Sequence, residues 1–200
     1  MNSLMPSHPT ANTPRARTHA AGQWSALAKW LHWIVAVLIA VQLVLGWMAA
    51  SWRLSPAKLE LFVWHKSTGM LVLLLVLVRL AWRLTHRPPA LPADMPRWER
   101  KAAAASHVLL YVAMLALPLS GWVVNSAAGV PFSIYWLVPL PDLVPADKHV
   151  ASVATTTHHM LAILLIALVA IHVGAALRHH FIKRDDVLVR MLPGKRRTES

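Results

Sequence analysis

The sequence contains no cysteine, few acidic residues and little charge of any kind. Without thiolates, the chain can form no disulfide, iron–sulfur cluster, thiolate-bound zinc site or covalently attached c-type haem. Only 14% of its 200 residues are charged, whereas 56% are hydrophobic. This balance argues against a soluble domain. Histidine, with twelve copies, is the metal-binding side chain that remains abundant.

The net charge of +12 arises from twenty lysines and arginines set against eight acids. Nucleic-acid binding would need basic residues interleaved with base-stacking aromatics on a soluble surface, and the chain lacks that pattern. In membrane proteins, basic residues gather instead on cytoplasmic loops. We therefore interpret the charge as a topology signal and expect no nucleic-acid partner.

Four apolar stretches are long enough to cross a bilayer core of roughly 30 Å. They cover residues 27–50, 61–84, 102–126 and 155–180. The third contains Pro118, which a membrane helix tolerates. The sequence thus predicts an all-α integral membrane protein, a four-transmembrane-helix bundle surrounded by membrane lipid.

The remaining segments are expected to be tails and loops around a single domain, residues 25–195. Residues 1–24 hold prolines and arginines without apolar periodicity, which favours a disordered tail over a signal peptide. Residues 196–200 are a short C-terminal tail. In the proline-rich third loop, Phe132–Val138 is expected to lie along the membrane interface as a short helix.

The lysine and arginine count fixes the expected orientation. The loops after the first and third stretches, with the start of the second stretch, hold four of the twenty, namely Arg53, Lys58, Lys66 and Lys148. The other side holds sixteen, so both termini are expected in the cytoplasm.

Histidines within the apolar stretches are the candidate functional residues, because an ionisable group inside a membrane is costly. His158 and His172 are 14 residues apart. This spacing is ~21 Å along a helix and nearly four full turns, which puts both on one face. His159 lies about 140° away from that face, so the periodicity favours His158.

The orientation pairs these histidines by depth. His32 and His172 should lie near the cytoplasmic surface, and His65 and His158 near the outer surface. We call them the inner pair and the outer pair. Two imidazoles from two helices are how a bundle holds a b-type haem. The sequence therefore predicts two haem b groups that pass electrons and have no open site for oxygen chemistry.

Other roles for the histidines agree less well with this pattern. A single intramembrane histidine often only bonds a neighbouring helix, but four that pair by depth are harder to explain in that way. A zinc or copper site is disfavoured because the four stretches hold no acidic residue or cysteine to complete it. Gly69 and Gly174 are small residues that would let a flat macrocycle approach the backbone.

Further polar residues lie close to the expected haems. Candidate contacts to a haem propionate or a quinone, on the inner side, are Arg79, Arg83, His107, Arg178 and His179. The arginines could equally be positive-inside anchors, and His107 a structural residue. On the outer side, Lys66, Arg53 and Lys148 would attract a small anion, and no catalytic residue is assigned.

Several motifs resemble the bacterial cytochrome b561 family, closest to its short four-helix dihaem members. They are W-L-H-W at His32, W-H-K-S-T-G at His65, V-R-L-A-W-R-L from Val78, S-H-V-L-L-Y and A-L-P-L-S-G from Ser106, and I-H-V-G-A-A-L-R-H-H with L-V-R-M-L-P-G-K near the end. The resemblance runs from about Trp24 to Lys195. Where relatives often carry W-H-E, this chain has Thr157-His158-His159, which leaves His159 as an alternative ligand.

The resemblance implies a location in the bacterial inner membrane and the same histidine pairs. It also implies a superoxide oxidase, which takes electrons from superoxide at the periplasmic face and reduces ubiquinone. The alternative is a cytochrome b subunit that links a partner dehydrogenase or hydrogenase to the quinone pool. A transporter or channel is disfavoured because the apolar stretches supply no hydrophilic path.

Overall fold

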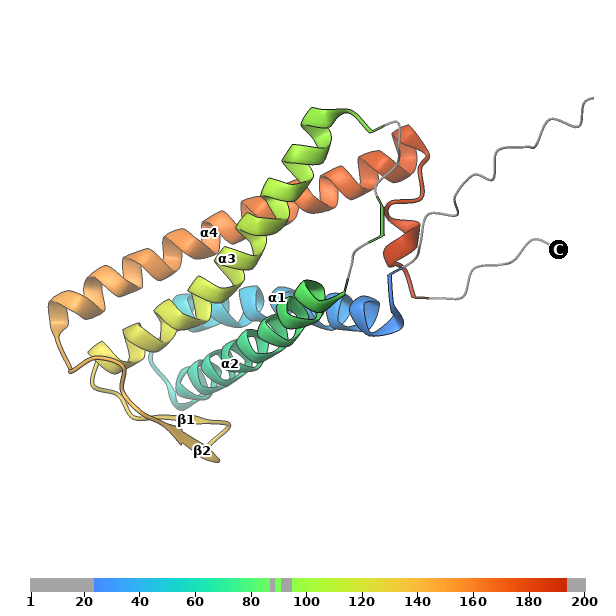
Figure 1. Ribbon diagram of the computed structural model, residues 1–200. Coiled ribbons are helices and arrows are strands. Elements are labelled where there is room, and N and C mark those ends of the chain that lie inside the picture. The colour runs from blue at the N-terminus through green and yellow to red at the C-terminus, as the bar shows by residue number, and fades with distance from the viewer. Residues whose placement is uncertain (1–23, 87–88, 91–94, 194–200) are drawn as a thin grey trace, which may run out of the picture.

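A computed structural model describes residues 24–86, 89–90 and 95–193 (Figure 1). Within these ranges lie four long helices, α1 (Ala26–Ser51), α2 (Pro56–Thr85), α3 (Arg97–Ala127) and α4 (Lys148–Arg178). Each is long and apolar enough to cross a membrane. The expected all-α, four-span fold is thereby confirmed. The expected tails, 1–24 and 196–200, fall outside the described residues except for Trp24.

Side-chain caps set where three of these helices begin. The Ser25 hydroxyl accepts from the backbone N–H of Ala28 at 3.3 Å, and Ser55 caps α2 ahead of Pro56. The Asp147 carboxylate accepts from the N–H groups of His149 and Val150, at 2.7 and 2.9 Å. Such caps satisfy amides that have no partner within the helix. Because of the last one, α4 begins at Lys148 and not near residue 155.

The helices pack as two pairs. α1 runs beside α2 and α3 beside α4, and α2 joins the pairs by contacting α3 (Figure 1). The sides of the bundle that face away from its core are largely aliphatic: Val37, Leu74 and Ile163 are each 57–60% exposed. A surface of this kind would aggregate in water and suits a lipid environment.

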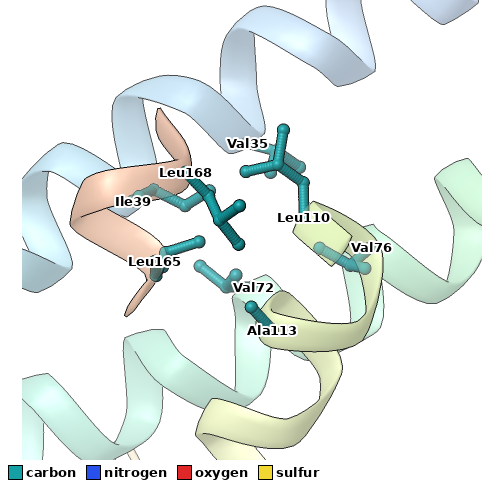
Figure 2. Packing of buried hydrophobic residues seen from close by; sticks show 8 residues of the cluster. All are labelled: Val35, Ile39, Val72, Val76, Leu110, Ala113, Leu165 and Leu168. Carbon is teal, nitrogen blue, oxygen red and sulfur yellow. The ribbon is translucent and has the colours of Figure 1, made fainter. Parts of the chain in front are cut away.

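A layer of buried aliphatic side chains joins all four helices (Figure 2). Each helix supplies two residues: Val35 and Ile39, Val72 and Val76, Leu110 and Ala113, Leu165 and Leu168. On α4, the two leucines come between His158 and His172 in the sequence. The layer therefore forms a low-dielectric division between the outer and inner histidines.

The loop between α3 and α4 contains a two-stranded antiparallel hairpin, β1 (Phe132–Ile134) and β2 (Val138–Leu140), with Phe132 opposite Leu140. The short helix expected over Phe132–Val138 was therefore wrong. Val138 and Leu140 each precede a proline. The proline ring makes the helical conformation unfavourable for the residue before it. A hydrogen bond from the Leu137 N–H to the Ile134 carbonyl, 2.9 Å, closes the turn.

After α4, the chain makes a π-helical turn, His179–Lys183, and folds back across the end of the bundle. Arg184 reverses the direction in the left-handed conformation, with φ 54°. A short 3₁₀ turn, Val189–Met191, follows. The Trp33 indole N–H on α1 donates to the Met191 carbonyl at 2.9 Å. This C-terminal segment therefore covers the same end of the bundle as the inner pair.

Candidate functional site

The inner pair is formed by α1 and α4. The ring centroids of His32 and His172 are 6.2 Å apart, with the ring planes at 68°. The ring of Trp33 stands edge-on to His32 at 5.3 Å. The structure thus brings together two histidines that are 140 residues apart in the sequence.

The outer pair has almost the same geometry and is formed by α2 and α4. The ring centroids of His65 and His158 are also 6.2 Å apart, with the planes at 85°. His159, the alternative ligand, is exposed on α4, with its ring 6.4 Å from that of His158. His158 is therefore the member of this adjacent pair that lies beside His65.

Hydrogen bonds and packing hold the outer rings. Nδ1 of His158 lies 3.1 Å from the Leu117 carbonyl and 3.0 Å from the Ser120 hydroxyl, both on α3. An imidazole that donates from one nitrogen to a carbonyl presents its other nitrogen as a ligand. The buried Nδ1 of His65 has no hydrogen-bond partner in the described part of the chain, so packing alone orients that ring.

Two glycines that sequence reasoning overlooked make room for these rings. A Cβ on Gly46 of α1 would lie 2.9 Å from Cε1 of His65, and one on Gly121 of α3 would lie 3.2 Å from Cε1 of His158. Both rings therefore rest against bare helix backbone. The sequence does carry a signal for both residues, because each is a glycine inside an apolar helix. Glycine destabilises a helix there, so its presence usually indicates that another group packs closely against the backbone.

The two glycines named from the sequence lie elsewhere. A Cβ on Gly69 would meet the Gln42 amide nitrogen at 2.9 Å. That nitrogen donates to the His65 carbonyl at 2.9 Å, so Gly69 makes room for a helix-to-helix hydrogen bond. A Cβ on Gly174 would meet no protein atom within 4 Å.

Both pairs fit a metal ion held between two imidazoles. Rings that bind one metal from opposite sides, each through a nitrogen at about 2 Å, have centroids roughly 6 Å apart. Both observed separations are 6.2 Å. In the ranges that the structure describes, no group of three or more His, Cys, Asp or Glu is arranged to hold a metal ion.

Next to the inner pair, α2 and α3 contribute a cluster of polar side chains. The ring of His107 lies 5.4 Å from that of His172. The Arg79 guanidinium donates from Nε to the Tyr111 hydroxyl at 3.0 Å, and the Arg83 guanidinium lies 6.0 Å from the centre of the same tyrosine ring. Three of the sequence candidates thus gather at this end.

A pocket of about 390 Å³ opens beside this cluster. Its walls include Trp24, Arg79, Trp82, Arg83 and Tyr111. Aromatic walls with two guanidiniums and a phenol suit a flat ligand whose oxygens accept hydrogen bonds. Among the described residues that line the pocket, none carries a carboxylate.

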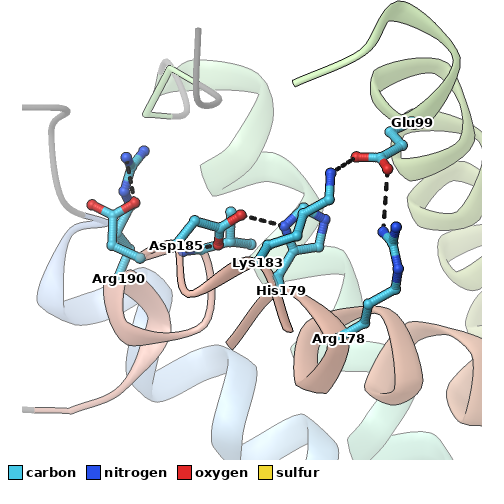
Figure 3. A network of polar contacts seen from close by, with 8 residues as sticks. Glu99, Arg178, His179, Lys183, Asp185 and Arg190 are labelled. Carbon is cyan, nitrogen blue, oxygen red and sulfur yellow. Dashed lines mark hydrogen bonds and ion pairs between the residues drawn. The ribbon is translucent and has the colours of Figure 1, made fainter. Parts of the chain in front are cut away.

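The other two inner candidates both have a protein partner, which lies on α3 for Arg178 and in the C-terminal segment for His179 (Figure 3). Arg178 bonds Glu99 of α3 at 3.2 Å, and Lys183 bonds the second oxygen of that carboxylate. His179 contacts Asp185 at 2.5 Å. These contacts tie α3 to the C-terminal segment, so Arg178 and His179 serve at least a structural purpose.

The outer cations differ in exposure. Arg53 and Lys148 are exposed, whereas Lys66 is half-buried. Nζ of Lys66 donates to Oδ1 of Asn125 at 2.8 Å and lies 5.1 Å from the centre of the Phe132 ring. Lys66 therefore has a fixed place next to His65 in the chain, and Arg53 and Lys148 remain on the surface.

Comparison with known proteins adds independent information. The family model described as prokaryotic cytochrome b561 matches residues 23–194. Cytochrome b561 homologs 2 and 1 of Escherichia coli (strain K12) are each 31% identical to the chain, over 88% and 84% of its length and 94% and 95% of theirs. A Yersinia pestis protein named probable superoxide oxidase CybB is 27% identical, over 87% of the chain and 98% of its own length. Because the family model extends from before α1 to beyond the C-terminal segment, the chain belongs to the prokaryotic cytochrome b561 family.

Proposed function

We propose that the protein carries electrons across the bacterial inner membrane through two b haems, oxidising superoxide at the outer face and reducing ubiquinone. Membership of the family supports the more general part of this proposal, a multi-pass membrane protein that transfers electrons through b-type haem. The observation that carries the proposal of two haems is the shared 6.2 Å separation in two pairs at different depths.

His32 and His172 would hold the inner haem, and His65 and His158 the outer one. When bound, the haems supply reversible one-electron chemistry. The bond between Nδ1 of His158 and the Leu117 carbonyl orients that imidazole and increases its basicity as a ligand. The aliphatic layer between the pairs excludes water from the middle of the bundle.

The proposed reaction balances as two one-electron oxidations and one two-electron reduction. Two superoxide anions each lose one electron and become O₂, and one quinone takes up two electrons and two protons to become a quinol. The relative named probable superoxide oxidase supports this activity. Lys66, Arg53 and Lys148 support it as well, because a positive field at the outer end raises the encounter rate with an anion.

The pocket at the inner pair would bind a ligand through oxygen atoms that accept hydrogen bonds. Haem propionates and quinone carbonyls both have such oxygens. Arg79 and Arg83 supply charged donors there. Tyr111 already accepts from Arg79, which leaves its own O–H free to donate. An Arg83→Met variant separates the two ligands: loss of haem indicates propionate binding, whereas a raised KM for quinone with both haems retained indicates a quinone site.

The activity is tested by supplying superoxide to the purified protein in detergent together with a water-soluble ubiquinone analogue. We expect quinol formation without any partner, at two superoxide consumed per quinol. A protein that reduces quinone only with a co-purified dehydrogenase or hydrogenase would instead be an electron-transfer subunit, and the superoxide proposal would be wrong.

A further inference from the structure

The hairpin β1–β2 contacts α2 on both sides of His65, at the end of the bundle opposite the C-terminal segment (Figure 1). The backbone N–H of Tyr135 donates to the Ser67 hydroxyl at 2.8 Å, and the Tyr135 hydroxyl lies 3.0 Å from that of Thr68. The ring of Trp64 meets Tyr135 edge-on at 5.4 Å. Ser67 is fully buried, so water does not compete for its bond.

The turn of this hairpin is strained. Its two central residues, Tyr135 and Trp136, have φ of 46° and 62°. A β-turn with positive φ at both central positions normally carries Asn-Gly, because side chains disfavour that conformation. Such strain persists where the surroundings determine the conformation, which is common at functional sites. Here Trp64 contacts both turn residues, so docking onto α2 holds the turn.

The same docking immobilises Lys66. Its Nζ donates to the Asn125 side chain and lies over the Phe132 ring of β1. The amide of Asn125 in turn donates to the Val130 carbonyl, just before β1, at 2.6 Å. The ammonium is therefore fixed by α3 and by the hairpin together.

The partners of Lys66 are neutral. Within the described ranges, no carboxylate pairs with its ammonium. The inner end differs, because Glu99 there bonds both Arg178 and Lys183. Lys66 thus lies half-buried without a carboxylate partner, where solvent screens a charge less than at the surface.

We infer that the hairpin, Ser67 and Asn125 are positioning elements that hold Lys66, the residue after His65, as a fixed positive charge without a carboxylate partner at the outer end of the bundle. A charge at that place would attract a small anion. It would also raise the midpoint potential of a haem that its chain neighbour His65 helps to hold, because a positive charge favours the form with one more electron. The inference rests on the proposed function for the outer haem at His65 and His158 and for superoxide as the anion.

The charge is tested with Lys66→Gln and, as the conservative control, Lys66→Arg. We expect Lys66→Gln to keep both haems, lower the midpoint potential of the outer haem and leave that of the inner haem unchanged. The rate with superoxide should fall roughly tenfold and depend less on ionic strength. Lys66→Arg should retain most of both properties. An unchanged outer potential in Lys66→Gln would overturn the inference.

The positioning is tested with Ser67→Ala against Ser51→Ala. The Ser51 hydroxyl is exposed and bonds only within its own helix, so its removal should change neither measurement. Ser67→Ala should lower the outer potential and the superoxide rate in the same direction as Lys66→Gln, by a smaller amount. Identical behaviour of the two alanine variants would mean that the hairpin does not position Lys66.

The two proposals can fail separately. If the wild type does not oxidise superoxide but Lys66→Gln still lowers the outer potential, the proposed function fails and the positioning inference stands. If the wild type oxidises superoxide and Lys66→Gln changes neither potential nor rate, the inference fails and the proposed function stands.

Discussion

Close packing against glycine backbone distinguishes the outer histidines. His65 rests against Gly46, and His158 against Gly121. Protein interiors are packed so densely that one added methyl group lowers the stability of the fold. The position of each ring therefore depends on a residue that has no side chain.

Gly46→Ala should displace the His65 ring, because the new Cβ would lie 2.9 Å from Cε1. Overpacking of this kind costs about 1–3 kcal/mol. We expect a lower Tm and a reduced content of the outer haem, measured by thermal unfolding and difference spectra. Gly174→Ala is the control, since its Cβ meets no protein atom within 4 Å; an equal loss of outer haem in both variants would contradict this explanation.

His158→Ala should lose one haem, and His159→Ala should keep both. His158 lies 6.2 Å from His65 and bonds α3 through Nδ1, whereas His159 is exposed. Haem content per chain after purification measures the difference. The reverse result would show that both the helical-phase argument and the observed pairing select the wrong ligand.

At the scale of elements, the ends of the helices carry much of what the periodicity could not predict. Hydropathy places the fourth stretch at 155–180, because Lys148 and His149 look like loop residues. The Asp147 cap extends α4 to Lys148, and an Asp in a proline-rich segment is too common for this role to stand out. The hairpin was missed for a similar reason, since tertiary contacts with α2 impose its unusual turn.

Asp147→Ala should lower stability by roughly 0.5–2 kcal/mol, which is typical for a lost N-cap. The carboxylate accepts from two backbone amides that have no helical partner. A lower Tm in detergent with unchanged haem spectra is the expected result, and Asp147→Asn should recover part of the loss. A Tm equal to that of the wild type would show that α4 does not need this cap.

Glu99→Gln should loosen the C-terminal segment, because the carboxylate bonds both Arg178 and Lys183 (Figure 3). The variant leaves two cations near one neutral amide. Hydrogen exchange of residues 179–192 should become faster, while the hairpin end remains as protected as in the wild type. If exchange of residues 179–192 is as slow in the variant as in the wild type, the Trp33–Met191 bond suffices to hold the segment.

At the scale of the whole molecule, the sequence predicts the architecture well because the membrane restricts it. Apolar length, the distribution of lysine and arginine and a 14-residue spacing were enough to expect four helices and two histidine pairs, and the structure brings those same pairs to 6.2 Å. Which rings Gly46, Gly121 and Ser120 contact could not be predicted, because those contacts depend on how neighbouring helices rotate and pack. The partners of Lys66 were missed for the same reason.

The central claim is that two histidine pairs hold two haems. The most direct test is a pyridine haemochrome assay on the detergent-purified protein, with reduced-minus-oxidised spectra. We predict about two b haems per chain, both six-coordinate and low-spin, with one lost in His32→Ala and the other in His65→Ala. A folded protein that binds one haem or none would contradict the claim.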